Sequence, residues 1–320
     1  MPIVPCVLVT FLIAAGAYGQ PVADVHGKGE YVEANGARLW YETIGNGPPI
    51  VVIAGGPGSS HLSFHPHFSE LGDEFQIVFY DAFGRGKSDR ADSSDEYSLT
   101  RDQEDLEALR EALGIDTWSV YGYSYGGVVA QAYALRYPSA VDNLILVSAL
   151  HSAEMWQAAN DYYNQTYQNQ FPEEWEVIRT VRSKGFRSSD PEHDDVYGLP
   201  TGIFYYYDAS NSGKLADKEY PHWNSAVYYA IAGKDANFWI GGDLTDFDFR
   251  SQLKNLTMPT LIMHGRYDRV AFPKYALQFR QYAPQAEFVM FEKSGHAPFR
   301  EVTEEHHSVL RRFLKQQGLD

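Results

Sequence analysis

One short stretch decides the fold, namely Gly122-Tyr123-Ser124-Tyr125-Gly126. It follows the apolar run Trp118 to Tyr121, typical of a buried strand, and it precedes Tyr125 to Tyr137, an apolar segment that stops before a proline as helices do. A serine between glycines at a strand-to-helix turn is held in a strained backbone conformation, with its hydroxyl exposed above the sheet edge. The pattern therefore predicts a nucleophile at Ser124 rather than a structural serine in a glycine-rich turn.

Strands and helices alternate on both sides of this turn. Besides the run at 118–121, short apolar runs predict strands at Arg38–Thr43, Ile50–Ile53, Ile77–Tyr80, Leu144–Val147, Thr260–Met263 and Phe288–Phe291. Helices are predicted from Thr100, where Thr100 to Gln103 form a capping-box pattern, and over Pro273–Tyr282 and Val302–Leu314. This alternation predicts an α/β fold with a mostly parallel central sheet.

Residues 151–248 lose the alternation of strands and helices. They hold 19 of the chain's 47 aromatic residues, among them Trp156, Trp175, Trp223 and Trp239. An aromatic-rich, mostly helical insert after the sixth strand is typical of a lid on a core domain. We therefore predict a signal peptide at 1–19, a core formed by 20–150 and 249–320, and a lid at 151–248.

Charge and composition narrow the class of partner. The chain carries 42 acidic against 26 basic residues, a formal net charge of −16, which argues against nucleic acid or an anionic membrane surface. Its 44% apolar content is sufficient for the core of a large α/β domain. We therefore expect a small molecule or a short peptide as the partner, and composition says nothing about the oligomeric state.

The first residues have the features of an export signal. Val7 to Ala15 is an apolar run, although no lysine or arginine precedes it, and small residues follow at Ala17 and Gly19, so cleavage before Gln20 is predicted. The run is too short to span a bilayer, which argues against stable membrane insertion. If the segment is cleaved, the protein is expected to be periplasmic or secreted, and otherwise cytoplasmic. The single cysteine, Cys6, would be lost with it.

Two further residues complete a predicted catalytic triad with Ser124. A serine hydroxyl needs a base that removes its proton as it attacks. His296 lies in a loop after the last predicted strand, and Asp268 follows the preceding strand, so both belong to the same edge of the sheet as Ser124. The chain order Ser, Asp, His is the one that this type of fold uses. Asp248 is the alternative acid, but its position favours packing or capping.

The oxyanion that forms during attack needs backbone N–H donors. Tyr125, directly after the nucleophile, would supply one. The second is expected from the loop after the strand Ile50–Ile53, where Pro57 has no N–H. We predict Gly56 for this role, with Gly55 as the second choice, although a tight structural turn is compatible with both.

Two other patterns do not indicate a site. Gly86-Lys87-Ser88 has the ending of a phosphate-binding loop, but Asp81 stands in place of the first glycine. His61, His65 and His67 lack metalloprotease spacing and a carboxylate partner, so we interpret them as the polar face of a helix. Neither a metal nor any other cofactor is expected.

With these residues in place, the chain from about residue 30 to its end resembles the proline iminopeptidase family of α/β-hydrolases. Beside the motif at Ser124, the resemblance rests on Gly55–Gly58 (Gly-Gly-Pro-Gly), Asp81–Asp89, Pro259–Leu261, Gly265–Asp268 and Ser294–His296. Together these motifs are specific, whereas the motif at Ser124 alone is generic. The resemblance implies a peptidase or amidase that removes an N-terminal residue, often proline, in a pocket roofed by the lid.

The chain departs from this family where the family binds the ammonium group of the substrate. A histidine that usually precedes the Gly-Gly-Pro-Gly motif is Ala54 here. The acidic residues that hold the ammonium correspond to Asn237, in the lid, and Arg269, directly after Asp268. Unless it points to solvent, an arginine there would repel an ammonium and attract a carboxylate. By this resemblance we expect Asn237, Arg269 and the nearby Trp239 to contact the substrate.

These residues predict hydrolysis of an ester or amide bond in a small substrate, by acyl transfer through an acyl-enzyme on Ser124. Three alternatives stay open: a true prolyl aminopeptidase, an esterase or lactonase with the same triad, and a non-catalytic binding protein on the same fold. A dehalogenase or an epoxide hydrolase would need an aspartate in place of Ser124.

Overall fold

The computed structural model describes residues 28–194, 196–197, 201–211, 217 and 219–319. The predicted signal peptide and Cys6 lie outside these residues, so export stays a prediction. Within the part that is described, no helix combines the length and the apolar content needed to cross a membrane.

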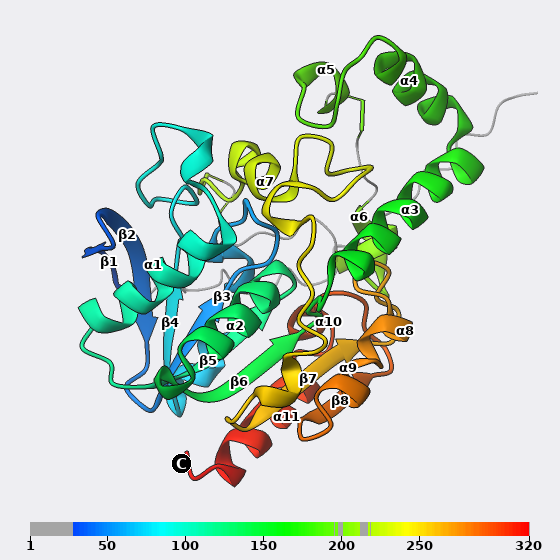
Figure 1. Cartoon of the computed structure of the whole chain (residues 1–320). Coiled ribbons are helices and arrows are strands. Elements are labelled where there is room, and N and C mark those ends of the chain that lie inside the picture. The colour runs from blue at the N-terminus through cyan, green and yellow to red at the C-terminus, as the bar shows by residue number, and fades with distance from the viewer. Residues whose placement is uncertain (1–27, 195, 198–200, 212–216, 218, 320) are drawn as a thin grey trace, which may run out of the picture.

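A sheet of eight strands runs through the centre of the molecule, in the order β1-β2-β4-β3-β5-β6-β7-β8 (Figure 1). Its strands are β1 (Lys28–Ala34), β2 (Ala37–Ile44), β3 (Pro49–Ile53), β4 (Gln76–Tyr80), β5 (Trp118–Tyr123), β6 (Val141–Val147), β7 (Thr260–Gly265) and β8 (Glu287–Phe291). The pairs β1–β2 and β2–β4 are antiparallel, and every other neighbouring pair is parallel. The predicted mostly parallel sheet is confirmed.

The apolar runs form strands because both faces of the sheet are buried. In β3, Ile50 and Val52 belong to one hydrophobic cluster, whereas Val51 and Ile53 belong to another. Successive side chains of a strand point to opposite faces, so a central strand that is covered on both sides is apolar throughout.

Helices cover both faces. α1 (Leu99–Ala112) and α2 (Tyr125–Arg136) contribute to the cluster that contains Val51, and α11 (Thr303–Gln316) contributes to the one that contains Ile50. The predicted helix at 273–282 is instead two short helices, α8 (Pro273–Ala276) and α9 (Phe279–Tyr282). Both contribute to the same cluster as α1 and α2. A further short helix, α10 (Pro298–Glu301), precedes α11.

The predicted start of α1 is wrong by one residue, and its predicted cap is wrong as well. Ser98 caps the helix, because its hydroxyl accepts a hydrogen bond from the Arg101 N–H at 3.0 Å. The side chain of Gln103 instead donates to the Leu99 carbonyl one turn earlier, at 3.0 Å. By residue type serine is the better cap, but only Thr100 has a glutamine three residues later, and this capping-box pattern favoured the wrong residue.

The lid, residues 151–248, lies between β6 and β7 at the carboxyl end of the strands (Figure 1). Its described helices of four residues or more are α3 (Ala153–Gln170), α4 (Pro172–Ser183), α5 (Pro191–Asp194), α6 (Thr201–Tyr205) and α7 (Ser225–Ala232). An isolated bridge between Ser152 and Asp248 joins the two ends of the lid. The helical insert after the sixth strand is confirmed, whereas the residue bounds of the domains stay a prediction.

Candidate active site

Ser124 lies at the sharp turn between β5 and α2. Its backbone has φ 55° and ψ −117°, a conformation that a residue with a side chain adopts only where the surrounding structure imposes it. The Ser124 N–H donates to the Val147 carbonyl at 2.9 Å, which ties the turn to β6. A Cβ on Gly126 would lie 2.2 Å from the Ile53 carbonyl oxygen, so only glycine allows α2 to begin this close to β3.

His296 and Asp268 lie in line with the Ser124 hydroxyl. The distance from Ser124 Oγ to His296 Nε2 is 2.9 Å, and that from His296 Nδ1 to Asp268 Oδ2 is 2.8 Å. The backbone N–H of His296 donates to the Tyr205 carbonyl at 2.6 Å, so a lid residue helps to fix the position of His296. All three side chains are buried.

The surroundings of Asp268 keep its carboxyl ionised. Burial alone would raise its pKa, but the neighbouring His296 ring and the hydrogen bond to it outweigh this effect, so the pKa lies below its ordinary value. Oδ1 also accepts hydrogen bonds from the N–H groups of Val270 and Ala271, at 2.8 and 2.7 Å. An ionised carboxylate only accepts, so Nδ1 of His296 carries a hydrogen, and in the neutral ring the lone pair is on Nε2, the nitrogen that faces Ser124.

The alternative acid, Asp248, has other contacts. Its Oδ2 pairs with Nη2 of Arg250 at 2.6 Å, and its Oδ1 accepts a hydrogen bond from the backbone N–H of Arg250 at 3.0 Å. This agrees with the interpretation of Asp248 as a packing or capping residue.

Ser124 and His296 line a cavity of about 240 Å³. Its aromatic wall consists of Tyr123, Tyr205, Tyr206, Trp223, Tyr228 and Phe299. Four of these six residues belong to the lid, so part of the aromatic content of the lid lies over the cavity. A pocket of this size and character suits a small, largely apolar ligand.

Gly56 lines the same cavity, and together with Tyr125 it also lines a small void of about 20 Å³. Its φ is +60°, and a Cβ there would lie 3.1 Å from both Ser59 Oγ and the Trp223 ring, so glycine is favoured on two counts. Tyr125 is the first residue of α2, so its N–H has no acceptor inside the helix. Gly55, the second choice, lines the same cavity, so the oxyanion role of Gly56 stays a prediction.

The family model of the alpha/beta hydrolase fold matches residues 48–301. The chain belongs to the α/β-hydrolase family. A proline iminopeptidase of Heyndrickxia coagulans is 29% identical over 287 residues, which cover 89% of this chain and 97% of that protein. A proline iminopeptidase of Saccharolobus solfataricus is also 29% identical, over 86% of this chain and 87% of that protein.

A solved structure agrees with these sequence relatives. The crystal structure of a proline iminopeptidase from Mycobacterium smegmatis superimposes with a TM-score of 0.71, at 24% identity over 90% of this chain and 98% of that chain. This structure shows the same fold, and by sequence the protein is an enzyme of the α/β-hydrolase family that is similar to proline iminopeptidases.

The three expected substrate contacts lie outside the cavity of this hydrolase. Trp239 is 65% exposed and lines a different hollow, and Asn237 uses its backbone to bond lid side chains. Arg269 is exposed, and its Nη1 donates to the Ile203 carbonyl at 2.6 Å. The structure therefore does not bring Asn237, Trp239 or Arg269 to the cavity that contains Ser124.

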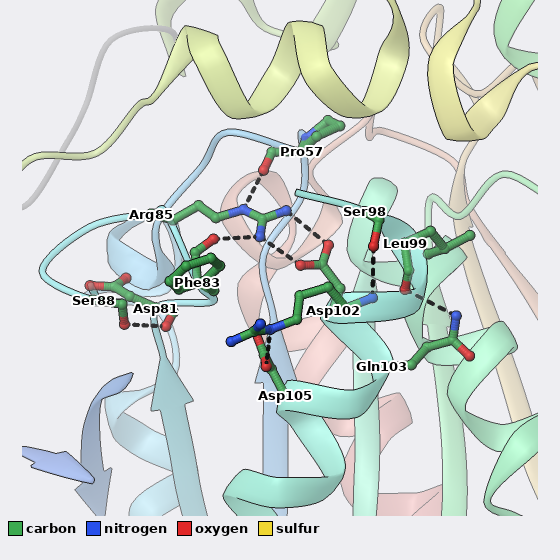
Figure 2. Close-up of polar contacts among 12 residues, drawn as sticks. Pro57, Asp81, Phe83, Arg85, Ser88, Ser98, Leu99, Asp102, Gln103 and Asp105 are labelled. Carbon is green, nitrogen blue, oxygen red and sulfur yellow. Dashed lines mark hydrogen bonds and ion pairs between the residues drawn. The ribbon is translucent and has the colours of Figure 1, made fainter. Parts of the chain in front are cut away.

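A buried ion pair adjoins the loop that carries Gly56 (Figure 2). Arg85 Nη1 and Nη2 donate to the two carboxylate oxygens of Asp102 at 2.6 and 2.8 Å, and Arg85 Nε donates to the Pro57 carbonyl at 2.5 Å. The Tyr125 hydroxyl donates to the same carboxylate at 2.7 Å. One ion pair therefore contacts both segments that carry the predicted oxyanion donors. No motif in the sequence indicated a role for either charged residue.

The interpretation of His61 and His65 as a polar helix face is wrong, because both are buried and both lie near carboxylates. His61 Nδ1 lies 2.8 Å from Asp81 Oδ1, and its Nε2 lies 3.5 Å from Glu42 Oε1. His65 Nε2 lies 3.6 Å from Glu42 Oε2. These carboxylates are on β2 and directly after β4, so the spacing of the histidines along the chain gave no sign of them.

The side chains of Glu42, His61 and His65 could together hold a divalent metal, since their ligand atoms lie within 4.8 Å of one another. A proton on His61 offsets one of the two negative charges of Glu42 and Asp81 without a metal. Burial alone would lower the pKa of His61, but the two carboxylates raise it to about 9. The expectation that no metal binds stays a prediction.

The raised pKa of His61 predicts a loss of stability in alkaline solution. The folded pKa of about 9 lies above the ordinary value of 6.5, so this contribution is complete below pH 6.5 and disappears as the pH rises through about 9. The free energy of unfolding should fall by about 3 kcal/mol over this range. Urea unfolding at pH 6.5, 8 and 9.5 measures the fall. His61→Gln should be less stable at pH 6.5 and show little of this slope; an equal slope in the variant would assign it to other groups.

Proposed function

We propose that this hydrolase cleaves its substrate through an acyl-enzyme on Ser124. Ser124 attacks the carbonyl carbon while His296 takes the hydroxyl proton, and His296 then passes this proton to the leaving group. In the second step water attacks the acyl carbon while His296 removes its proton, the bond from the acyl carbon to Ser124 Oγ breaks, and His296 gives the proton to Oγ. Asp268 orients the imidazole and stabilises its cation. The observation that carries the proposal is the aligned pair of contacts of 2.9 and 2.8 Å from Ser124 to His296 to Asp268.

The backbone N–H groups of Gly56 and Tyr125 stabilise the oxyanion in this proposal. Charge develops on the carbonyl oxygen as Ser124 attacks, and fixed donors at that point lower the barrier. The left-handed turn at Gly56 and the start of α2 at Tyr125 support this assignment.

The bond that is cleaved is an ester or amide of a small molecule or a short peptide. The size of the cavity supports a small substrate. The named relatives are proline iminopeptidases, which supports an N-terminal prolyl peptide. The esterase or lactonase alternative is supported by the polar groups of the cavity wall, none of which, among the described residues, is a carboxylate that could hold an amine.

A fluorophosphonate probe tests the nucleophile. It should react at Ser124, and peptide mass spectrometry should locate the adduct there, because only a serine next to a base attacks such a probe rapidly. Ser59→Ala and Ser63→Ala are matched controls, since both serines also line the cavity, and both variants should still be labelled. Labelling that persists in Ser124→Ala would place the nucleophile elsewhere.

A further inference from the structure

The cavity beside Ser124 has an unusual balance of charge for an enzyme that resembles aminopeptidases. Among the described residues that line it there is no aspartate or glutamate. Arg300, on α10, is the one residue among them with a permanent charge, because the two lining histidines can be neutral. The ammonium group of a free N-terminus would therefore meet a cation and no carboxylate there.

Arg300 is held in place by uncharged groups. Its Nε and Nη2 donate to the Ser63 carbonyl at 3.3 and 2.9 Å, and its Nη1 donates to the Tyr206 hydroxyl at 3.0 Å. A guanidinium has five N–H groups, so two of them remain as donors for a ligand after these three contacts. Such a fixed fork matches the two oxygens of a carboxylate.

The neighbouring acid does not neutralise this charge. Glu301 Oε2 accepts the Gly295 N–H at 2.6 Å, and its Oε1 accepts the Asp208 N–H at 3.1 Å, so it supports the loop that carries His296. The hydrogen bonds of Arg300 in the described part of the chain are thus with a backbone carbonyl and a phenol, and its guanidinium also lies 5.9 Å from the centre of the Phe299 ring. Its positive charge can therefore interact with a ligand in the cavity.

We infer that the cavity takes a substrate with a carboxylate group, bound by Arg300, and not one with a free N-terminal ammonium. This inference rests on the proposed function, since it concerns the substrate of the same serine. The aromatic wall could in principle attract a cation through its ring faces, but Arg300 already places a cation beside that wall. Repulsion between like charges and the absence of a described acid in the wall both act against a second one.

Matched aryl esters test the inference. In the first series the acyl chain ends in a methyl, a carboxylate or an ammonium group. In the second series the same three groups end a substituent of the phenol. The rate measured without enzyme is subtracted for each ester. In at least one series kcat/KM should be highest for the carboxylate and lowest for the ammonium. Arg300→Gln should reduce the ratio of carboxylate to methyl ester by about ten- to hundredfold, the scale of a charge-assisted contact. Arg300→Lys should keep part of the preference.

Arg269→Gln is the matched control, because it removes an arginine of the same chain that lies outside the cavity, and it should leave the ratio unchanged. Each ratio compares two esters on the same preparation of one variant. Unfolded protein lowers both kcat/KM values by the same factor, so it does not alter the ratio. A wild-type preference for the ammonium ester, or an equal ratio in Arg300→Gln, would overturn the inference. Loss of all hydrolysis in Ser124→Ala tests the proposed function separately.

A binding readout covers the case in which none of the esters is turned over. A short dicarboxylate should protect Ser124 of the wild type from the fluorophosphonate probe, and a diamine of equal length should not. The protection should be lost in Arg300→Gln and retained in Arg269→Gln. Protection by the diamine, or protection by the dicarboxylate that survives Arg300→Gln, would contradict a carboxylate site at Arg300.

Discussion

Replacement of Ser124 by alanine is expected to lower kcat by about 10⁴- to 10⁶-fold with little change in thermal stability. The variant keeps the Cβ and the backbone of the turn but has no oxygen that could attack the carbonyl. The remaining rate would come from the oxyanion donors and from substrate binding. The kcat for an uncharged aryl ester and the unfolding temperature of the same preparation measure the two quantities.

His296→Ala should reduce kcat by a similar factor, and the double variant should be scarcely worse than either single one. The base has no function without the nucleophile, so residues that act as a unit give effects that do not add. Additive losses in the double variant would show that Ser124 and His296 act in different steps. Each preparation should first be shown to be free of wild-type enzyme, because a trace of it would set the apparent residual rate.

Most of the fold was predictable because the central strands carry their own signal. Every residue of β5 is buried, and four of the five in β3 are, so β3 is an unbroken apolar run and β5 is largely apolar, with the polar Ser119 as an exception. β1 was not predicted, because an edge strand buries less: Glu30 is exposed, and Tyr31 is 47% exposed. An edge strand with such polar positions has no clear pattern in the sequence.

The candidate triad was predictable for a topological reason. Ser124, Asp268 and His296 each follow a parallel strand, and the carboxyl ends of parallel strands meet at one edge. No such topological rule predicts which other side chains line the cavity. Arg269 and Arg300 both lie near triad residues in sequence, but only Arg300 lines the cavity, and that difference depends on the direction of each side chain.

The pair of Arg85 and Asp102 gives the second large prediction. Asp102→Asn should lower the free energy of unfolding by about 3–5 kcal/mol, because it leaves the buried guanidinium of Arg85 without its counter-charge. It should also lower kcat with little effect on KM, by up to about a hundredfold, since Pro57 and Tyr125 are no longer held together. Urea unfolding and steady-state kinetics on an uncharged ester measure these effects.

The pair of Arg38 and Asp89 is a matched control for this experiment. It has the same chemistry, with a distance of 2.8 Å between Nη2 and Oδ1, but its side chains are 56% and 33% exposed. Asp89→Asn should therefore change neither the unfolding midpoint nor kcat to a large extent. A loss as great as that in Asp102→Asn would mean that burial is not the cause of the difference.

Replacement of both charges separates folding from catalysis. The double variant Arg85→Met with Asp102→Leu leaves no buried charge unpaired, so it should regain part of the stability that Asp102→Asn loses. Its kcat should stay low, because methionine cannot donate to the Pro57 carbonyl and leucine cannot accept from the Tyr125 hydroxyl. If kcat recovered together with stability, the ion pair would act on folding alone, and the position of Gly56 beside Ser124 would depend on other contacts.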